Sequence, residues 1–227
     1  MECFVIFVMA WCWLNATESK PHNVSCNCKM TVNEITDIQK EQLLKVTPSK
    51  DWTMEYRPCQ VTLKNGDKLD NVYIQEEQSY LKAWGALPDA DPGKRYVLIE
   101  DVSEITESPN RLRPELANKI YKAGESGMGY CLYKLVLDNG KTIDVCVGNA
   151  VDFVPLPDGL TTNNIKDVLP HQASRKNFVN GPEYYWCLFK GDIQKTYKDN
   201  TGEETTATNS TLPKAGRSWW QKLFSSE

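Results

Sequence analysis

The sequence predicts a mainly β, α+β fold in which two similar small β-barrel units are followed by a polar tail. Three observations support this prediction. VTLKNGDKLDNVYI (61–74) and LVLDNGKTIDVCVG (135–148) match at a Leu, at Asn-Gly and at the Asp four residues after the Gly. Short runs of alternating apolar residues are separated by turn residues, as in β-rich proteins. Residues 191–217 are rich in Thr, Gly, Asn and Lys, a composition typical of flexible linkers.

The first unit is expected to open with a helix. Thr31 and Glu34 have the spacing of a capping box, in which each side chain satisfies a free backbone amide. The helix should stop before Pro48. Its predicted apolar face contains Ile35, Ile38, Leu43 and Val46.

Strands are expected to follow this helix. Residues 59–74 predict a hairpin, because Asn65-Gly66 can supply the positive φ angles of a tight type I′ turn. Residues 80–85 and 95–106 are predicted to continue the sheet.

The second unit repeats this order. A helix is predicted between Ser108 and Gly124, with Pro114 in its first turn and Gly124 as its C-terminal cap. A second Asn-Gly hairpin follows at 130–147. Further strands are expected at 151–156, 165–170 and 184–189, and Ile99-Glu-Asp-Val102 is matched by Ile165-Lys-Asp-Val168.

These elements divide the chain into a first helix and β-barrel (30–110), a second helix and β-barrel (111–190), a linker (191–217) and an aromatic tail (218–227). The first 29 residues contain a twelve-residue apolar run at 3–14. Two interpretations stay open: a signal peptide that ends near Ala16, which implies export, or translation that starts at Met30. The preferred localisation is cytoplasmic.

Composition argues against several functions. The net charge of −4 argues against general nucleic-acid binding, which needs clustered Lys and Arg. The chain has only two histidines, His22 and His171, which limits multi-His metal sites. Cys26 and Cys28 near His22 lack the four-ligand spacing of structural zinc sites. We therefore predict no metal and no cofactor. The cysteines expected as small buried apolar residues are Cys59, Cys131, Cys146 and Cys187.

A short helix followed by about five bent strands, with an Asn-Gly turn between the first two, resembles the Sm-like and wider SH3-like small β-barrels. VTLKNGDKLDNVYI is similar to the first Sm-like motif and YVLIEDVSEI (96–105) to the second. The resemblance covers residues 33–106 and extends faintly over 115–170. The family's RNA contacts do not carry over: the stretch QEEQSYLKAW has no Asn, and Glu100-Asp101 stands where the family has Arg-Gly. Acidic residues there oppose phosphate binding.

Catalytic interpretations rest on few residues. GESGMGYC (124–131) nearly spells Gly-x-Ser-x-Gly, but it follows a helix, whereas a nucleophile elbow follows a strand. Cys131 could act as a nucleophile with His171 as its base. The carboxylates considered as cation ligands do not have calcium-loop spacing. They are Asp89, Asp91, Asp101, Asp138 and Asp144.

The preferred hypothesis is a non-enzymatic binding or adaptor protein that acts through protein–protein contacts. The alternatives are a small cysteine-dependent hydrolase or transferase that uses Cys131 and His171, and an Sm-like RNA binder. The tail RSWWQKLF is predicted to dock on another protein, with weak membrane-interface contact as a further destination. Its anchors are Trp219, Trp220, Leu223 and Phe224.

Overall fold

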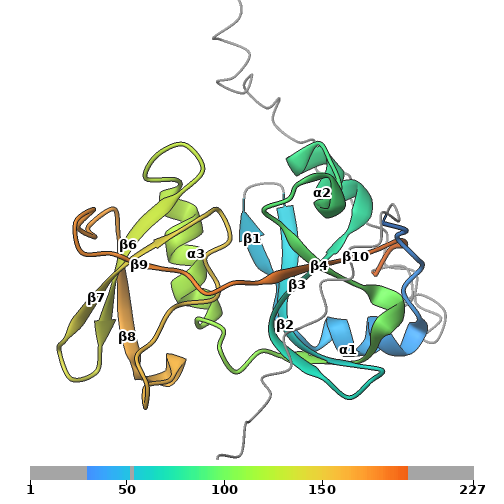
Figure 1. The fold of residues 1–227 in the computed structure, drawn as a ribbon. Helices are drawn as coiled ribbons and strands as arrows, with labels where there is room; N and C mark the ends of the chain where they lie inside the picture. Colours follow the sequence, from blue (N-terminus) through green and yellow to red (C-terminus); the bar gives the residue numbers. More distant parts are fainter. Residues whose placement is uncertain (1–29, 52–53, 194–227) are drawn as a thin grey trace, which may run out of the picture.

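The computed structural model describes residues 30–51 and 54–193. These residues form two β-sheets and a few short helices, so the predicted mainly β, α+β class is confirmed. Figure 1 shows the two sheets side by side, one with α1 and α2 and the other with α3. The predicted leader or alternative start, most of the linker and the aromatic tail lie outside the described residues.

The first sheet has the order β1-β2-β3-β10-β4, and β5 also pairs with β2. Its strands are β1 (Ser49–Asp51), β2 (Met54–Leu63), β3 (Lys68–Glu76), β4 (Arg95–Leu98), β5 (Val102–Glu107) and β10 (Tyr185–Phe189). The second sheet has the order β8-β6-β7-β9. Its strands are β6 (Cys131–Leu137), β7 (Thr142–Val147), β8 (Ile165–Pro170) and β9 (Val179–Asn180).

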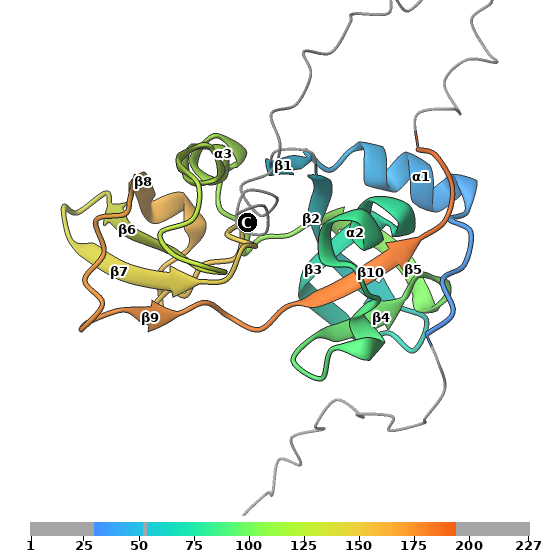
Figure 2. The ribbon, with the colours of Figure 1, turned by 90° about the horizontal axis from the view of Figure 1, so that it is seen from above.

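The strand pairings of the described residues form two open sheets rather than the closed barrels predicted from the sequence. The C-terminal strand β10 departs further from the prediction. It comes from the end of the second predicted unit, yet it inserts in parallel between β3 and β4 of the first sheet. Figure 2 shows the chain leaving β9 and crossing to this position.

The predicted strand at 80–85 is a helix. α2 (Glu77–Trp84) begins where the Glu76 carboxylate accepts hydrogen bonds from the backbone N–H groups of Gln78 (2.8 Å) and Ser79 (2.7 Å). It ends at Gly85, whose φ of 77° gives the left-handed C-cap that glycine favours. A helix capped at both ends therefore replaces the expected strand.

The first helix begins later than predicted. α1 (Asp37–Leu44) is capped by Thr36 and Gln39, not by Thr31 and Glu34. The preceding residues are extended because they bond to the chain after β10, where Ile35 N–H donates to Lys190 O at 3.2 Å. This shift turns Ile38 outward, so that it is 68% exposed, against the prediction that it faces the core.

The third helix and both Asn-Gly hairpins are confirmed, but the turn type is not. α3 (Pro114–Ala123) has Pro in its first turn and Gly124 as its C-cap. In the hairpins, the φ angle is positive at Gly66 (92°) and Gly140 (79°) but not at the preceding Asn. A type I′ turn needs positive φ at both central residues, so each loop is instead a turn closed by one left-handed glycine.

β5 and β8 each pair in the same way with the first strand of the hairpin in their sheet. Leu63 lies opposite Val102 and Val61 opposite Ile105 in the first sheet. In the second sheet, Leu137 lies opposite Ile165 and Leu135 opposite Val168. The pattern that matches Ile165–Val168 is therefore 102–105. It is not 99–102, because Ile99–Asp101 forms a 3₁₀ turn, η2. The described residues contain two further 3₁₀ turns, η1 (Pro88–Ala90) and η3 (Thr162–Asn164), and η3 precedes β8.

Residues 151–156 were predicted as a strand and form none. Only Phe153 makes an isolated bridge, to Arg111. The backbone here bonds to other parts of the fold, since Leu112 N–H donates to Asp152 O at 2.7 Å and the Tyr73 hydroxyl lies 3.1 Å from Asp152 N. This segment therefore joins the two sheets instead of extending one.

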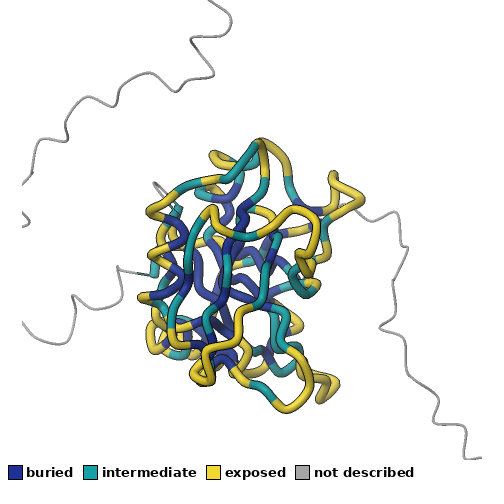
Figure 3. Tube along the Cα trace, turned by 90° about the vertical axis from the view of Figure 1, so that its left-hand side faces the viewer, coloured by how far each residue is buried: buried dark blue, intermediate teal, exposed yellow. Residues whose placement is uncertain are grey.

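The larger apolar core lies between the two sheets. It contains Tyr73 and Trp186 from the first sheet together with Tyr121 of α3 and Phe153. A second core fills the other face of the first sheet beneath α1. Figure 3 shows that the buried segments occupy the interior and the exposed ones the loops. Both sheets thus contribute side chains to the larger core.

Candidate functional site

Neither hydrogen-bonding contact of the His171 ring involves Cys131. The ring instead lies 2.8 Å from Ser126 Oγ through Nδ1 and 3.2 Å from the carbonyl oxygen of Ala123 through Nε2. Burial, with Glu125 and Asp51 nearby, raises the pKa of Cys131 to about 12. At neutral pH almost all of this thiol is protonated, and the thiolate is the nucleophilic form.

The pair of Ser126 and His171 is a contact that sequence reasoning did not foresee. His171 is the one described non-glycine residue with positive φ (63°), a conformation often found at functional sites. However, Ser126 Oγ also accepts a hydrogen bond from Leu132 N–H at 2.8 Å. These contacts tie the end of α3 to β6 and β8, so we interpret the pair as a structural clamp.

Three of the five aspartates considered as cation ligands have the following partners. Asp89 accepts a hydrogen bond from Met30 N–H (2.8 Å), and Asp91 accepts one from Gly93 N–H (3.0 Å). Asp144 forms an ion pair with Lys134 at 3.4 Å. Within residues 30–51 and 54–193, no three His, Cys, Asp or Glu side chains gather as a metal site would require.

Asp152 is a buried charge that the sequence analysis missed. Its carboxylate accepts hydrogen bonds from Ser49 Oγ (2.5 Å) and Tyr121 OH (2.6 Å) and lies 3.7 Å from Arg111 Nε. Burial raises the pKa of Asp152, and these partners oppose the shift. The cluster joins β1, α3 and the segment between the sheets. An Asp inside the apolar run VDFV was the signal that could have revealed it.

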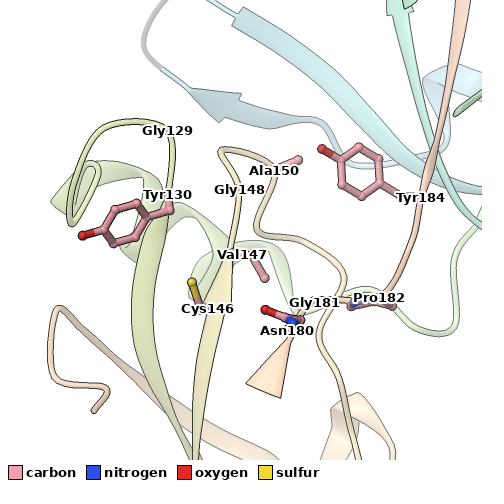
Figure 4. Close-up of a pocket in the computed structure, with 10 residues that line it drawn as sticks. All are labelled: Gly129, Tyr130, Cys146, Val147, Gly148, Ala150, Asn180, Gly181, Pro182 and Tyr184. Carbon is pink, nitrogen blue, oxygen red and sulfur yellow. The ribbon is translucent and has the colours of Figure 1, made fainter. Parts of the chain in front are cut away.

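A cavity of about 290 Å³ lies beside β7 and β9. Its walls are rich in small residues, and Figure 4 shows the rings of Tyr130 and Tyr184 at its two ends. Cys146, half-buried, also faces it. Its lining also includes Gly129, Tyr130, Gly148, Asn180 and Tyr184.

Three exposed apolar residues lie next to lining residues of this cavity in the sequence. Met128 is 77% exposed, Phe178 40% and Val179 48%. Each lies within two sequence positions of a residue that lines the cavity. We call these three residues the apolar rim. Exposed apolar patches often mark surfaces that bind other proteins.

A second cavity, of about 470 Å³, lies at the C-terminal end of β10. Its charged wall is already engaged, because Arg57 donates hydrogen bonds to Val46 O (2.5 Å) and to Glu55 Oε1 (3.1 Å). Glu76, also on this wall, caps α2. The first cavity with its apolar rim is therefore the stronger candidate site.

Comparison with protein-family models, with curated protein sequences and with solved structures gave no significant match. No helix in the described part of the chain is long and apolar enough to cross a bilayer.

Proposed function

We propose that the chain is a non-enzymatic binding protein that acts through protein–protein contacts made by the first cavity and its apolar rim. The observation that carries this proposal is the exposure of Met128 and Phe178, which lie within two sequence positions of residues that line the first cavity. The cavity is slightly smaller than the range of about 300–1,000 Å³ common for small-molecule sites. A single anchoring side chain of a protein partner suits this size better.

The test compares two pairs of exposed apolar residues. Met128→Ser with Phe178→Ser removes the apolar rim, whereas Ile38→Ser with Leu44→Ser removes exposed apolar side chains of α1. Each full-length variant is used as bait in native cell extract, and captured proteins are compared by quantitative mass spectrometry. A partner lost with the first pair and retained with the second supports the proposal. Equal capture by both variants contradicts it.

The tail is proposed as a second contact. Trp219 and Trp220 lie outside the described residues, and their place in this proposal rests on the sequence. Trp219→Ala with Trp220→Ala is expected to leave the melting temperature almost unchanged and to reduce partner capture. A large drop in melting temperature would mean that the tail belongs to the protein's own core.

A duplicated scaffold is part of this proposal. The helix, the Asn-Gly hairpin and the third strand paired to its first strand recur in both halves, which supports two copies of one small β unit. The common register of 102–105 and 165–168 is the main support. The Sm-like resemblance concerns this unit, and its acidic Glu100-Asp101 argues against RNA as the partner.

The cysteine-dependent alternative has less support. It requires Cys131 as a thiolate, and burial keeps this thiol protonated at neutral pH. It also requires His171 as the base, and the ring of His171 is already held by Ser126 and Ala123.

A further inference from the structure

We propose that the outer edge of β9 binds an extended segment of another protein, which adds a strand to the second sheet and runs parallel to β9. The segment has an acidic residue followed by a short β-forming stretch. This inference rests on the proposed function, because Val179 of the apolar rim lies in β9 and Phe178 directly precedes it. It deepens that function by naming the kind of partner and how the partner binds.

The outer edge of β9 is open within the described part of the chain. β9 ends the strand order of the second sheet, and Figure 2 shows it at the border of that sheet. Gly181 N–H donates to Cys146 O of β7 at 3.1 Å. Because neighbouring residues of a strand direct their backbone groups to opposite edges, the N–H and C=O of Asn180 face away from β7. Free backbone groups at a sheet edge are a template for a further strand.

The first sheet shows what fits beside such a strand. Asn180 of β9 pairs in parallel with Cys146. Tyr185, at the start of β10, pairs in parallel with Val72. Both partners lie six residues after the left-handed glycine of their hairpin. On its other side Tyr185 pairs with Arg95 of β4, again in parallel. The outer edge of β9 is therefore the counterpart of the edge that β4 fills in the first sheet.

The second sheet has no counterpart of β4 among the described residues. β4 directly precedes η2, and residues 158–161 stand in the same place before η3. These four residues form no strand. They follow Pro157 and include Gly159, whose φ of 82° is outside the range of a strand. The place beside β9 is thus left open to a strand from another chain.

The charge beside this edge indicates which segments it accepts. Arg175 and Lys176 are exposed in the turn that precedes β9. A strand that runs parallel to β9 brings its N-terminal end to this basic pair, so an acidic residue at that end is favoured. Val179, 48% exposed, offers an apolar contact further along the edge.

The probe is a fluorescein-labelled peptide with the sequence of residues 89–98, DADPGKRYVL, which contains β4 and two preceding acidic residues. Asp91 lies four residues before Arg95, as Lys176 lies four residues before Asn180. The pairing seen in the first sheet would therefore bring Asp91 to the level of Lys176. A scrambled peptide of the same composition is the control.

Fluorescence anisotropy with the full-length chain measures the affinity. We expect saturable, micromolar binding of the probe and at least about tenfold weaker binding of the scrambled peptide. The absence of saturable probe binding up to about 1 mM would overturn the inference.

Asn180→Pro tests whether the peptide binds at the edge of β9. Proline has no N–H and is tolerated in edge strands where the N–H faces solvent, so this chain should fold. We expect it to lower the affinity for the probe at least about tenfold, because an outward donor is lost and the ring obstructs pairing. Asn180→Ala keeps the backbone N–H and is the matched control, with unchanged affinity. Equal affinities of the folded Pro and Ala variants would contradict the inference.

A charge exchange tests the direction of the bound strand and does not depend on the folding of the proline variant. Lys176→Glu changes an exposed residue. We expect it to weaken binding of the probe about two- to fivefold, as for an exposed ion pair. A probe with Asp91→Lys should bind Lys176→Glu better than it binds the unchanged chain. If the altered probe shows no such preference, the parallel placement is wrong.

Sedimentation velocity of the full-length chain separates a partner from a second copy. A dimer that Asn180→Pro dissociates would assign the edge to self-association and overturn the inference. The two proposals also fail separately. If the rim variants lose a partner from cell extract but the probe does not bind, the proposed function stands and the inference fails. If the probe binds at the edge of β9 but the rim variants capture partners normally, only the proposed function fails.

Discussion

At the scale of single residues, Asp152 decides how the two sheets are held together. Asp152→Ala would leave the buried hydroxyls of Ser49 and Tyr121 without their acceptor, whereas Arg111 would keep its 2.7 Å ion pair with Glu107. Two buried donors left without a partner typically cost about 2–6 kcal/mol together. We expect the free energy of unfolding, measured in urea, to fall by about that amount.

Asp167→Ala is the control for this prediction. Asp167 pairs with Lys119 at 2.7 Å, and both side chains are more than 40% exposed. Exposed pairs of this kind contribute about 0–1 kcal/mol. Equal losses in the two variants would show that the Asp152 cluster is not a special connection.

Thiol reactivity gives a second prediction at this scale. With a pKa of about 12, Cys131 is a thiolate in only about one molecule in ten thousand at pH 8. Cys146 is half-buried and lines the first cavity. We expect iodoacetamide at pH 8 to label Cys146 at least about tenfold faster than Cys131 in the folded protein. Peptide mapping measures both rates, and rapid labelling of Cys131 would restore the cysteine-enzyme hypothesis.

At the scale of elements, the two hairpins depend on one glycine each. Gly66 and Gly140 have φ angles of 92° and 79°, and a Cβ at either position would meet no atom within 4 Å. Gly66→Ala and Gly140→Ala should therefore cost only the backbone strain of a left-handed residue, about 1–2 kcal/mol each.

Gly93→Ala is the comparison for these turns, because Gly93 has no positive φ. Its effect on the free energy of unfolding should stay within about 0.5 kcal/mol. A cost at Gly66 or Gly140 no larger than that at Gly93 would contradict the left-handed turn geometry in that hairpin.

At the scale of the whole molecule, β10 makes the first half dependent on the C-terminal part of the chain. A chain that ends at Glu183 would lack the strand between β3 and β4 and the buried ring of Trp186. Loss of that ring alone typically costs about 3–5 kcal/mol. We expect such a chain to lose cooperative thermal unfolding, as followed by circular dichroism.

A chain that ends at Ile193 retains β10 and should unfold cooperatively, with almost the full melting temperature. The isolated first unit, 30–110, should not fold, since it lacks β10. Cooperative unfolding of that fragment would instead mean that the unit is an independent domain.

Local patterns in the sequence were sufficient for several features. The mainly β, α+β class, the two Asn-Gly hairpins and α3, with Pro114 at its start and Gly124 at its end, depend on contacts within a few residues. The sequence also predicted a buried Cys131. Such features are set by backbone conformational preferences and apolar periodicity, which the chain displays directly.

Long-range contacts decided the rest. The place of β10 depends on pairing with strands far earlier in the chain, which a repeat pattern cannot reveal. The late start of α1 follows from the bond between Ile35 and Lys190, and the extended segment around Asp152 follows from its contacts with Tyr73 and Leu112. The first cavity is likewise formed by β7, β9 and the loop at Gly129, which are separate in the sequence. Only tertiary structure brings these surfaces together, because burial and strand pairing depend on which distant segments meet.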